Sequence, residues 1–304
     1  MELGQLRALR ELGDRGSIAA VAAALHVTPS SVSQQISALQ RTSPVPLTVK
    51  DGRRTALTDA GRALALAAIG VEEAFARAEQ AVARFQSEPA GTVSVAGFHS
   101  ACLAVFGPLL TALHGPDRPR VSLSDFDVAQ ERFPALTSDH DLVLAHRLAG
   151  SPPWPATVRV TPLLFEPLDL AVRRDHRLAA KPSVTPADLR GEDWVAVHEG
   201  FPLERAVGVI AGVGGGDARI VHRINEFSVA AAVVEAGGGV ALMPRYTTDH
   251  PGLVLLPLAH PGLGRHIDCL ARPETLERAG VAAVLALIST ITDDLVRRSA
   301  TMNA

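Results

Sequence analysis

The amino-acid sequence predicts an α+β protein made of a winged helix-turn-helix, a long linker helix and a two-lobed α/β domain. Three patterns support this fold class. Near the N-terminus, three short segments have helical spacing of apolar residues, and a tight turn joins the last two. An uninterrupted heptad stripe follows. Beyond it, short apolar runs alternate with helical patterns, as in α/β domains. These patterns divide the chain into residues 1–58, 59–89 and 90–304.

The composition is that of a folded globular protein. Of the 304 residues, 47% are hydrophobic and 20% are charged, which suits two or three ordinary domains. No apolar run reaches about 18 residues, and the first residues lack a leader pattern, so we expect a cytoplasmic protein without membrane contact. Cys102 and Cys269 are too far apart in the sequence for a disulfide framework or a zinc motif, and we expect no metal or cofactor.

Positive charge is concentrated in the N-terminal part. Residues 1–58 contain seven Lys or Arg and four Asp or Glu, a net charge of +3, so the remainder of this chain of net charge −3 carries −6. A basic head on an acidic body suits a local contact with nucleic acid. The excess is small and by itself gives weak support.

The first 41 residues predict three short helices. Ser17 can cap the second helix, Thr28 can cap the third, and Pro29 fits the first position of the third because its missing N–H costs nothing there. The second and third helices are joined by a tight turn, which is the organisation of a helix-turn-helix. The apolar positions that define the helices are Leu6, Leu9 and Leu12, then Ile18, Val21 and Leu25, then Val32, Ile36 and Leu39.

A short hairpin is predicted after the third helix. Residues 47–49 and 55–57 can form two strands around the polar tip at 50–54, which contains an Asp-Gly turn signal. We interpret this hairpin as the wing. Arg53 and Arg54 at its tip can reach phosphates or a narrow minor groove, although a solvated charged turn is the common alternative.

Thr58 can cap a long helix that runs to about Ser87. Its apolar seam alternates steps of four and three residues, which favours a coiled coil and self-association through residues 59–87. The alternative is a helix that lies on its own domain. A dimer fits a DNA reader best, and a tetramer stays open. The seam consists of Leu64, Ala68, Val71, Phe75, Ala78, Val82 and Phe85.

The C-terminal part predicts an open α/β fold with substantially parallel sheets. We expect lobe I at 91–165 and 267–300 and lobe II at 166–266, with helices at 101–113 and 228–236. A last amphipathic helix around 281–295 is expected to pack on lobe I. The expected strands are 93–96, 121–124, 142–145, 195–197, 220–224 and 240–243.

The third helix has a polar outward face. With Val32 pointing inward and about 100° per residue, Ser30, Gln34, Ser37 and Arg41 point outward and Ser33 lies on the flank. Such a face can enter the major groove, where Gln suits adenine N6 and N7, whereas a merely solvated face is the alternative. The helix N-terminus over 28–31, which includes Ser31, can also bind a phosphate.

At this point the residues resemble the head of LysR-type transcriptional regulators. The resemblance rests on 17–22, on Leu25-His26-Val27-Thr28-Pro29-Ser30-Ser31-Val32-Ser33, on 36–39, on Val45-Pro46-Leu47 and on Arg53, Leu57-Thr58 and Ala60-Gly61. Weaker similarity continues through Pro162-Leu163, Asp175-His176, Leu189 and 234–244. The resemblance covers nearly the whole chain.

The resemblance implies a dimerising linker helix and a periplasmic-binding-protein-like sensor with a small-molecule effector between its lobes. It also implies a homodimer or homotetramer on double-stranded DNA. Pro29, Ser30, Ser33 and Gln34 then look like the base-reading positions, and Arg53 looks like the wing contact. The chain departs from the family at Gln34, where many members have Arg, and at Thr42-Ser43-Pro44 before Val45. These departures affect the base that is read and the packing of the wing.

The effector site is expected where strands of the α/β domain end at helix N-termini. Ser100 and the N–H groups of Ala101 and Cys102 could hold a carboxylate, so an anionic effector is our hypothesis. For each single residue except Ser100, a loop position without a ligand is an equal alternative. The expected lining residues are His99, Ser100, Ala101, Phe126, His146, His198 and Phe227.

Enzyme functions have little support. The chain has no Gly-x-Ser-x-Gly and no His-Glu-x-x-His motif, and the glycine run at 212–217 is better explained as a turn than as a nucleotide loop. An exported solute receptor is a second possible class, and a thiol sensor that uses Cys102 and Cys269 is a third. The helix-turn-helix opposes the solute receptor, and the absence of a resolving thiol or an activating cation nearby in the sequence opposes the thiol sensor.

Overall fold

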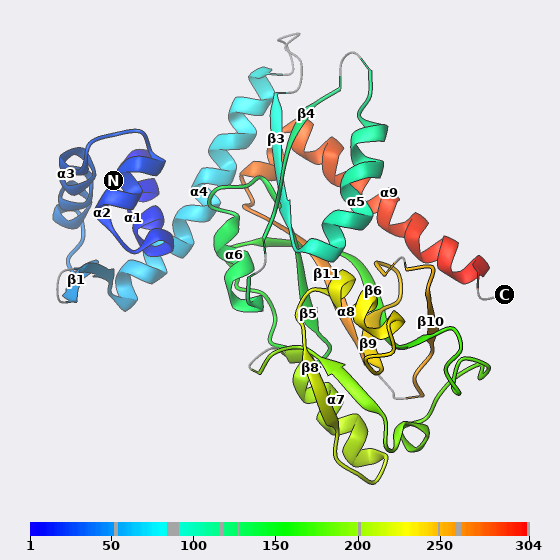
Figure 1. Ribbon diagram of the computed structural model, residues 1–304. Helices are drawn as coiled ribbons and strands as arrows, with labels where there is room; N and C mark the ends of the chain where they lie inside the picture. The colour runs from blue at the N-terminus through cyan, green and yellow to red at the C-terminus, as the bar shows by residue number, and fades with distance from the viewer. Residues whose placement is uncertain are drawn as a thin grey trace.

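The computed structural model describes residues 1–51, 54–83, 91–115, 118–126, 128–199, 202–248, 250–259 and 263–302. Figure 1 shows a small helical head, a long helix that leads away from it, and a larger α/β part at the far side of that helix. The predicted α+β fold class is confirmed in this arrangement.

The head consists of three helices, α1 (Leu3–Arg15), α2 (Ile18–Ala24) and α3 (Pro29–Arg41). Both predicted N-caps are present, since Ser17 Oγ accepts from the N–H of Ala20 and Thr28 Oγ1 from that of Ser31, each at 3.2 Å. Gly16 ends α1 with φ of 70°, a left-handed conformation that glycine adopts without strain. The three helices share a core built from the apolar positions expected from the sequence.

The wing and the linker helix follow in the predicted order. Strands β1 (Thr48–Asp51) and β2 (Arg54–Leu57) pair antiparallel, and the tip of the wing, including Arg53, lies outside the described residues. The helix α4 (Asp59–Ala83) follows Thr58, whose Oγ1 accepts from the N–H of Gly61 at 3.0 Å. The predicted end of this helix near Ser87 also lies outside the described residues.

The heptad seam of α4 divides into two parts. Leu64 and the buried Ala68 pack against the core of the head. Farther along, Val71, Phe75 and Val82 are 47%, 44% and 63% exposed. The first turns of α4 therefore lie on their own domain, whereas the later turns present an exposed apolar stripe.

A seven-stranded mixed sheet forms the centre of the α/β part, in the order β10-β6-β11-β5-β3-β4, with β9 also paired to β6. The prediction of substantially parallel sheets is wrong for this sheet, because β6 and β11 pair antiparallel with each other and β11 also pairs antiparallel with β5. Among the strands of the described residues, parallel ladders join β3 to β4 and β5, and β7 to β8. The strands are β3 (Thr92–Gly97), β4 (Arg120–Asp125), β5 (Leu142–Leu148), β6 (Arg159–Arg173), β7 (Asp193–Ala196), β8 (Arg219–Arg223), β9 (Ala241–Pro244), β10 (Leu253–Leu256) and β11 (Gly264–Ala271).

The error has a physical cause in β6 and β11. β6 contains prolines at 162 and 167 and the acidic residues Glu166 and Asp169, and β11 contains Arg265 and Asp268. These residues interrupt the apolar runs that identify a strand in a sequence. For this reason neither strand was predicted. The role of both strands in connecting the two lobes was not predicted either.

The apolar cores define two lobes. Lobe I has a core built from residues of 93–160 and 267–291, and lobe II has cores built from residues of 170–256. Short 3₁₀ turns lie at Gln130–Arg132 (η1), Pro186–Leu189 (η2) and Thr275–Glu277 (η3). The helices are α5 (His99–Ala112), α6 (Phe133–Leu136), α7 (Pro202–Val213), α8 (Phe227–Glu235) and α9 (Ala279–Met302).

Helix α9 is long and apolar enough over Ala279–Ser299 to cross a membrane by length and composition. Its inner face, however, contains Val281, Val284 and Ile288, all fully buried in the core of lobe I. α9 is therefore a packing helix of lobe I, as the sequence predicts.

Candidate nucleic-acid interface and effector cleft

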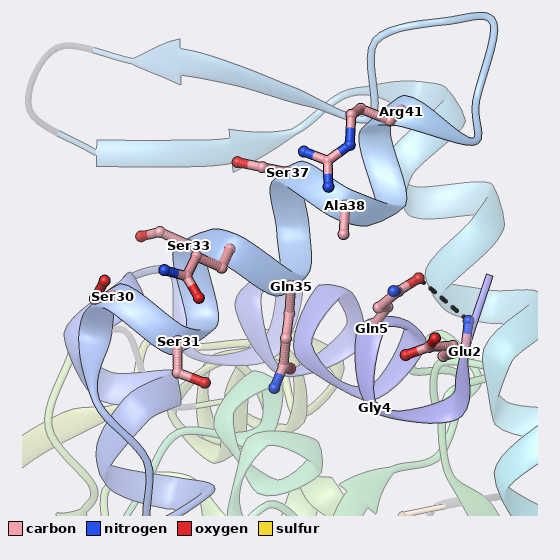
Figure 2. A pocket seen from close by; sticks show the side chains of 11 residues that line it. Glu2, Gly4, Gln5, Ser30, Ser31, Ser33, Gln35, Ser37, Ala38 and Arg41 are labelled. Carbon is pink, nitrogen blue, oxygen red and sulfur yellow. Dashed lines mark hydrogen bonds between the residues drawn. The ribbon is translucent and has the colours of Figure 1, made fainter.

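The outward face of α3 is a polar, exposed surface. Val32, Ile36 and Leu39 are buried in the head, and the residues predicted to point away from them are exposed. Figure 2 shows this surface beside the start of α1. It is hollowed by about 600 Å³. The predicted positions that line the hollow are Ser30, Ser31, Ser33, Gln34, Ser37 and Arg41.

The structure adds residues to this surface that the sequence analysis missed. Glu2, Gly4 and Gln5 at the start of α1 line the same hollow, and the N–H of Glu2 donates to Gln5 Oε1 at 3.2 Å (Figure 2). Gln35 also lines it, and its buried Oε1 has no hydrogen-bond partner within the described part of the chain. A contact between the first helix and the third lies beyond any local sequence pattern.

The start of α3 combines an exposed helix N-terminus with small polar side chains. Thr28 and Pro29 are exposed, and Ser31 is half-buried. The N–H of Ser31 is satisfied by Thr28 Oγ1, and Pro29 has no N–H, so a phosphate here would use the N–H of Ser30. The side chains of Arg53 and Arg54 lie outside the described residues.

Part of the positive charge of the head points away from this surface. The buried Arg10 bonds Glu72 and Glu274, each at 2.8 Å, and Arg15 bonds Asp139 at 3.0 Å. These arginines therefore contact the linker helix and the sensor rather than DNA. The exposed cations that remain on the described part of the head include Arg7, Arg41 and Lys50.

Between the two lobes, the guanidinium of Arg265 forms the centre of a buried polar cluster. Its Nη2 donates to Ser100 Oγ in lobe I and to Thr247 Oγ1 in lobe II, both at 2.9 Å. The guanidinium carbon lies 4.8 Å from the ring centre of Phe98 and 5.6 Å from that of Phe227. One side chain of β11 thus contacts the helix starts of both lobes.

Glu166 of β6 neutralises Arg265. It is fully buried, and its Oε2 accepts from Arg265 Nε at 2.9 Å. Its Oε1 accepts from the N–H groups of Tyr246 and Thr247 at 2.8 and 2.7 Å. Neither Arg265 nor Glu166 was predicted from the sequence, although a charged residue inside an otherwise apolar strand is a signal for a paired buried group.

Two predicted histidines lie at this cluster, and the first is His146. It packs edge-on against Phe98 and Phe133, with ring centres 4.7 and 5.4 Å apart. Burial, together with the positive charge of Arg265, lowers the pKa of His146 to about 3, so its ring is neutral.

The second, His99, lies between one carboxylate of each lobe. Its Nδ1 is 3.3 Å from Asp125 of lobe I and its Nε2 is 3.4 Å from Glu226 of lobe II. Glu226 also caps α8. Burial opposes its ionisation, but the hydrogen bonds from Ser228 and Val229 outweigh this and lower the pKa of Glu226.

The structure therefore brings four of the seven predicted lining residues together, namely His99, Ser100, His146 and Phe227. Phe126 packs edge-on against His140 in lobe I instead. His198 is exposed, and its N–H donates to Asn225 Oδ1. Across the described ranges, no hydrogen bond, ion pair or ring contact joins His198 to the other four.

The carboxylate-binding role expected for Ala101 and Cys102 needs correction. The N–H groups of both residues donate to the carbonyl oxygen of Phe98 at 3.1 Å. Ser100 Oγ is likewise occupied by Arg265. These two N–H groups are therefore satisfied within α5, because Phe98 takes the N-cap position and its carbonyl oxygen accepts from both.

Neither cysteine has the surroundings of a reactive thiol. Cys102 and Cys269 are buried and free. Burial raises the pKa of each thiol to about 12, and the negative charges of Asp125 and Asp268 act in the same direction.

A head with an exposed reading helix, a wing and a linker helix, attached to two lobes that meet at a buried polar cluster, defines a DNA-binding regulator with a small-molecule sensor. Comparison with known families agrees. The family model of the bacterial regulatory helix-turn-helix protein, lysR family, matches residues 3–62, and that of the LysR substrate binding domain matches residues 86–291. The chain belongs to the LysR family of transcriptional regulators.

Known proteins similar to this chain are regulators as well. Transcriptional dual regulator GltC of Bacillus subtilis is 28% identical over 287 residues, which cover 92% of this chain and 93% of GltC. HTH-type transcriptional regulator MetR of Escherichia coli is 30% identical over 210 residues, which cover 68% of this chain and 62% of MetR.

Solved structures share the fold of the whole chain. A full-length OxyR variant from Pseudomonas aeruginosa matches with a TM-score of 0.64 at 17% identity, covering 96% of this chain and 94% of that one. Full-length CbnR in complex with its target DNA matches with a TM-score of 0.53 at 22% identity, covering 96% and 100%. The predicted family and regulator function are confirmed by the two family models and the similar regulators.

Proposed function

We propose that the chain reads double-stranded DNA with the outward face of α3. The observation that carries this proposal is the exposed, compact row of Ser30, Ser33, Gln34 and Ser37 opposite a buried apolar face. Gln34 then bonds an adenine edge in the major groove, and the serines bond bases or bridging waters. Thr28, Pro29 and Ser31 at the helix start, with Arg53 and Arg54 of the wing, contact the backbone or the minor groove.

The effector then binds between the lobes, at the cluster around Arg265. His99, Ser100, His146 and Phe227 lie at this cluster, and a ligand there touches both lobes at once. Phe126 and His198 remain candidate lining residues, but they could contact the effector only if the cleft changes shape.

The charges support a neutral or zwitterionic effector rather than a simple anion. Glu166 already neutralises Arg265, and Asp125 and Glu226 add negative charge beside His99. A bare carboxylate would have to displace Glu166 and would face two further carboxylates. Calorimetry with matched amino acids, amines and organic acids tests this, and binding limited to the organic acids would contradict it.

We further propose a non-enzymatic, cytoplasmic regulator divided into 1–58, 59–89 and 90–304, with lobe I at 91–165 and 267–300 and lobe II at 166–266. The exposed stripe of Val71, Phe75 and Val82 supports a dimer through the linker helix. The relatives' names support regulation rather than catalysis. The high thiol pKa values oppose a redox sensor.

Binding to the DNA upstream of the chain's own gene, measured across a salt series, tests the reading face. Gln34→Ala is expected to lose about 1–3 kcal/mol of discrimination between specific and random DNA. The salt dependence should stay unchanged, because Gln34 neutralises no phosphate. Val27→Ala, at an exposed apolar position outside the reading face, is the matched control. Unchanged specificity of Gln34→Ala would move base reading to the serines or the wing.

A further inference from the structure

The head and the sensor of one chain are joined by a charged interface. Arg272 of lobe I bonds Glu11 of α1, and it also bonds Asp14 of α1 at 2.7 Å. From the other side, Arg15 of α1 donates to Asp139 and to the carbonyl oxygen of Ser138 in lobe I, at 3.0 and 2.8 Å. Each partner therefore supplies both signs of charge, which fixes one orientation of the head.

The linker helix belongs to the same interface. Arg10 of α1 donates to Glu72 of α4 and to Glu274 of lobe I, each at 2.8 Å. Arg10 and Glu72 are 4% and 3% exposed. A cavity of about 210 Å³ lies beside this network, lined by Arg10, Asp14 and Arg272 together with residues of α6 and its surroundings.

The interface is paired but not fully satisfied. Glu72 Oε1 and Glu274 Oε2 are buried without a hydrogen-bond partner in the described parts of the chain. Burial raises the pKa of Glu72, and Glu274 adds to the rise, although Arg10 opposes it. Burying a carboxylate oxygen without a hydrogen-bond donor costs free energy. This cost is removed when the interface opens and water hydrates the oxygen. Such an interface is suited to reversible docking rather than to permanent attachment.

Strand β11 connects this interface to the cleft. Arg265, at the centre of the cleft cluster, is the second residue of β11, and Arg272 follows directly after its last residue. Seven residues of strand span about 24 Å. β11 is hydrogen-bonded on both sides, with β5 and with β6, and its register with β6 shifts between Ile267 and Asp268. The sheet therefore holds the strand along the whole stretch between Arg265 and Arg272.

We propose that the DNA-binding head docks reversibly on lobe I of its own chain through Arg272 and its carboxylate partners, and that β11 links this docking to the cleft at Arg265. The docking part stands on the interface alone. The link to the cleft rests on the effector site proposed above. In the docked form α1 and α4 are held against lobe I, so the position of the reading helix relative to the sensor depends on the state of the cleft.

Pulsed electron paramagnetic resonance on the full chain tests the docking. Spin labels at Ala19→Cys and Thr290→Cys occupy exposed positions on the head and on α9, and the native Cys102 and Cys269 are buried. Labelled chains are diluted with unlabelled ones, so that only distances within a chain contribute. The unmodified interface should give one narrow distance distribution.

Arg272→Gln removes the cation that pairs with two carboxylates of the head. It should raise the undocked-to-docked ratio about a hundredfold, because Asp14 loses its bond to Arg272 and the buried Glu11 keeps only its pair with Arg15. The distance distribution should then become broad. Arg278→Gln is the matched control, since Arg278 pairs with Asp141 within lobe I and does not touch the head. An Arg272→Gln distribution as narrow as that of the control would overturn the docking proposal.

Variants of the cleft test the link. Arg265→Lys keeps the charge but loses the paired bonds, and Ser100→Ala removes one acceptor of Arg265 without changing any charge. Both should shift the docked population, with a smaller shift for Ser100→Ala. If neither variant shifts it while Arg272→Gln does, the docking stands and the link through β11 is refuted. That outcome leaves the proposed effector site intact, because effector binding is measured separately by calorimetry.

Discussion

The half-buried His146 makes the stability of lobe I depend on pH between 5 and 7. In the folded chain its pKa is lowered from 6.5 to about 3. In the unfolded chain the ring takes up a proton near pH 6.5, whereas the folded chain excludes that proton. The stability contributed by the neutral ring is therefore complete above pH 6.5 and is lost as the pH falls from there towards 3.

The size of the effect follows from the two pKa values. At pH 5 the unfolded chain is 1.5 pH units below its own pKa, whereas the folded chain is still well above 3. At about 1.36 kcal/mol per unit, the loss between pH 7 and pH 5 is about 2 kcal/mol. A loss of this size is a large share of the stability of an ordinary domain.

His146→Phe should abolish this loss. The ring already lies among Phe98 and Phe133, so a phenyl group keeps the edge-on contacts and removes only the titrating nitrogen atoms. Urea unfolding at pH 7 and pH 5, followed by tryptophan fluorescence, gives the comparison, because Trp154 lies 6.5 Å from Phe133 in the same lobe. Carboxylates titrate equally in both proteins and cancel in the difference.

The matched control is His222→Gln, which removes an exposed histidine from β8 of lobe II. It should retain the pH dependence of the wild type. If His146→Phe and the wild type lose the same free energy of unfolding between pH 7 and pH 5, the neutral ring is refuted.

Two further predictions concern the head and the thiols. Gly61→Ala should destabilise the head strongly, because the new Cβ would lie 2.0 Å from the carbonyl oxygen of Leu47, whereas Gly70→Ala on the same helix meets nothing within 4 Å and should stabilise it by about 0.5–1 kcal/mol. Thermal unfolding of the two variants compares them, and equal midpoints would contradict the close approach. Cys102 and Cys269 should not react with a thiol reagent at pH 8 until the chain unfolds, because burial raises both pKa values to about 12. Rapid labelling of the native protein would reopen the possibility of a thiol sensor.

The head was predictable because its determinants are local. The caps at Ser17 and Thr28, the proline at the start of α3 and the buried face of that helix all lie within a few residues of the structure that they specify. The outward positions of α3 then follow from helical geometry alone. The residues of α1 that complete the hollow do not, because they reach it through tertiary packing.

The centre of the cleft could not be predicted in the same way. Arg265 and its partner Glu166 are 99 residues apart, and Arg265 and Ser100 are 165 apart. The pairing depends on the antiparallel register of β6 and β11, and both strands were hidden by their own charged residues and prolines. Ser100 and His146 were predicted because each comes after a predicted apolar strand, 93–96 and 142–145, which is a local signal for the edge of a sheet. The strand β5 in fact continues through His146 to Leu148.

The charge of the head shows why composition alone does not locate an interface. The net charge of +3 over residues 1–58 suggested contact with DNA, yet Arg10 and Arg15 bond carboxylates of the linker helix and of lobe I. At most five of the seven cations then remain for phosphates in each docked head. Each neutralised phosphate contributes about −0.9 to the slope of log K against log salt, so a docked head should give a slope no steeper than about −4.5. Undocking would release Arg10 from Glu274 and Arg15 from Asp139, but Arg10 would keep Glu72 of α4 and Arg15 would keep Glu11 of α1. Both arginines therefore stay paired within the head and the linker helix, and the same five cations are left for phosphates in either form.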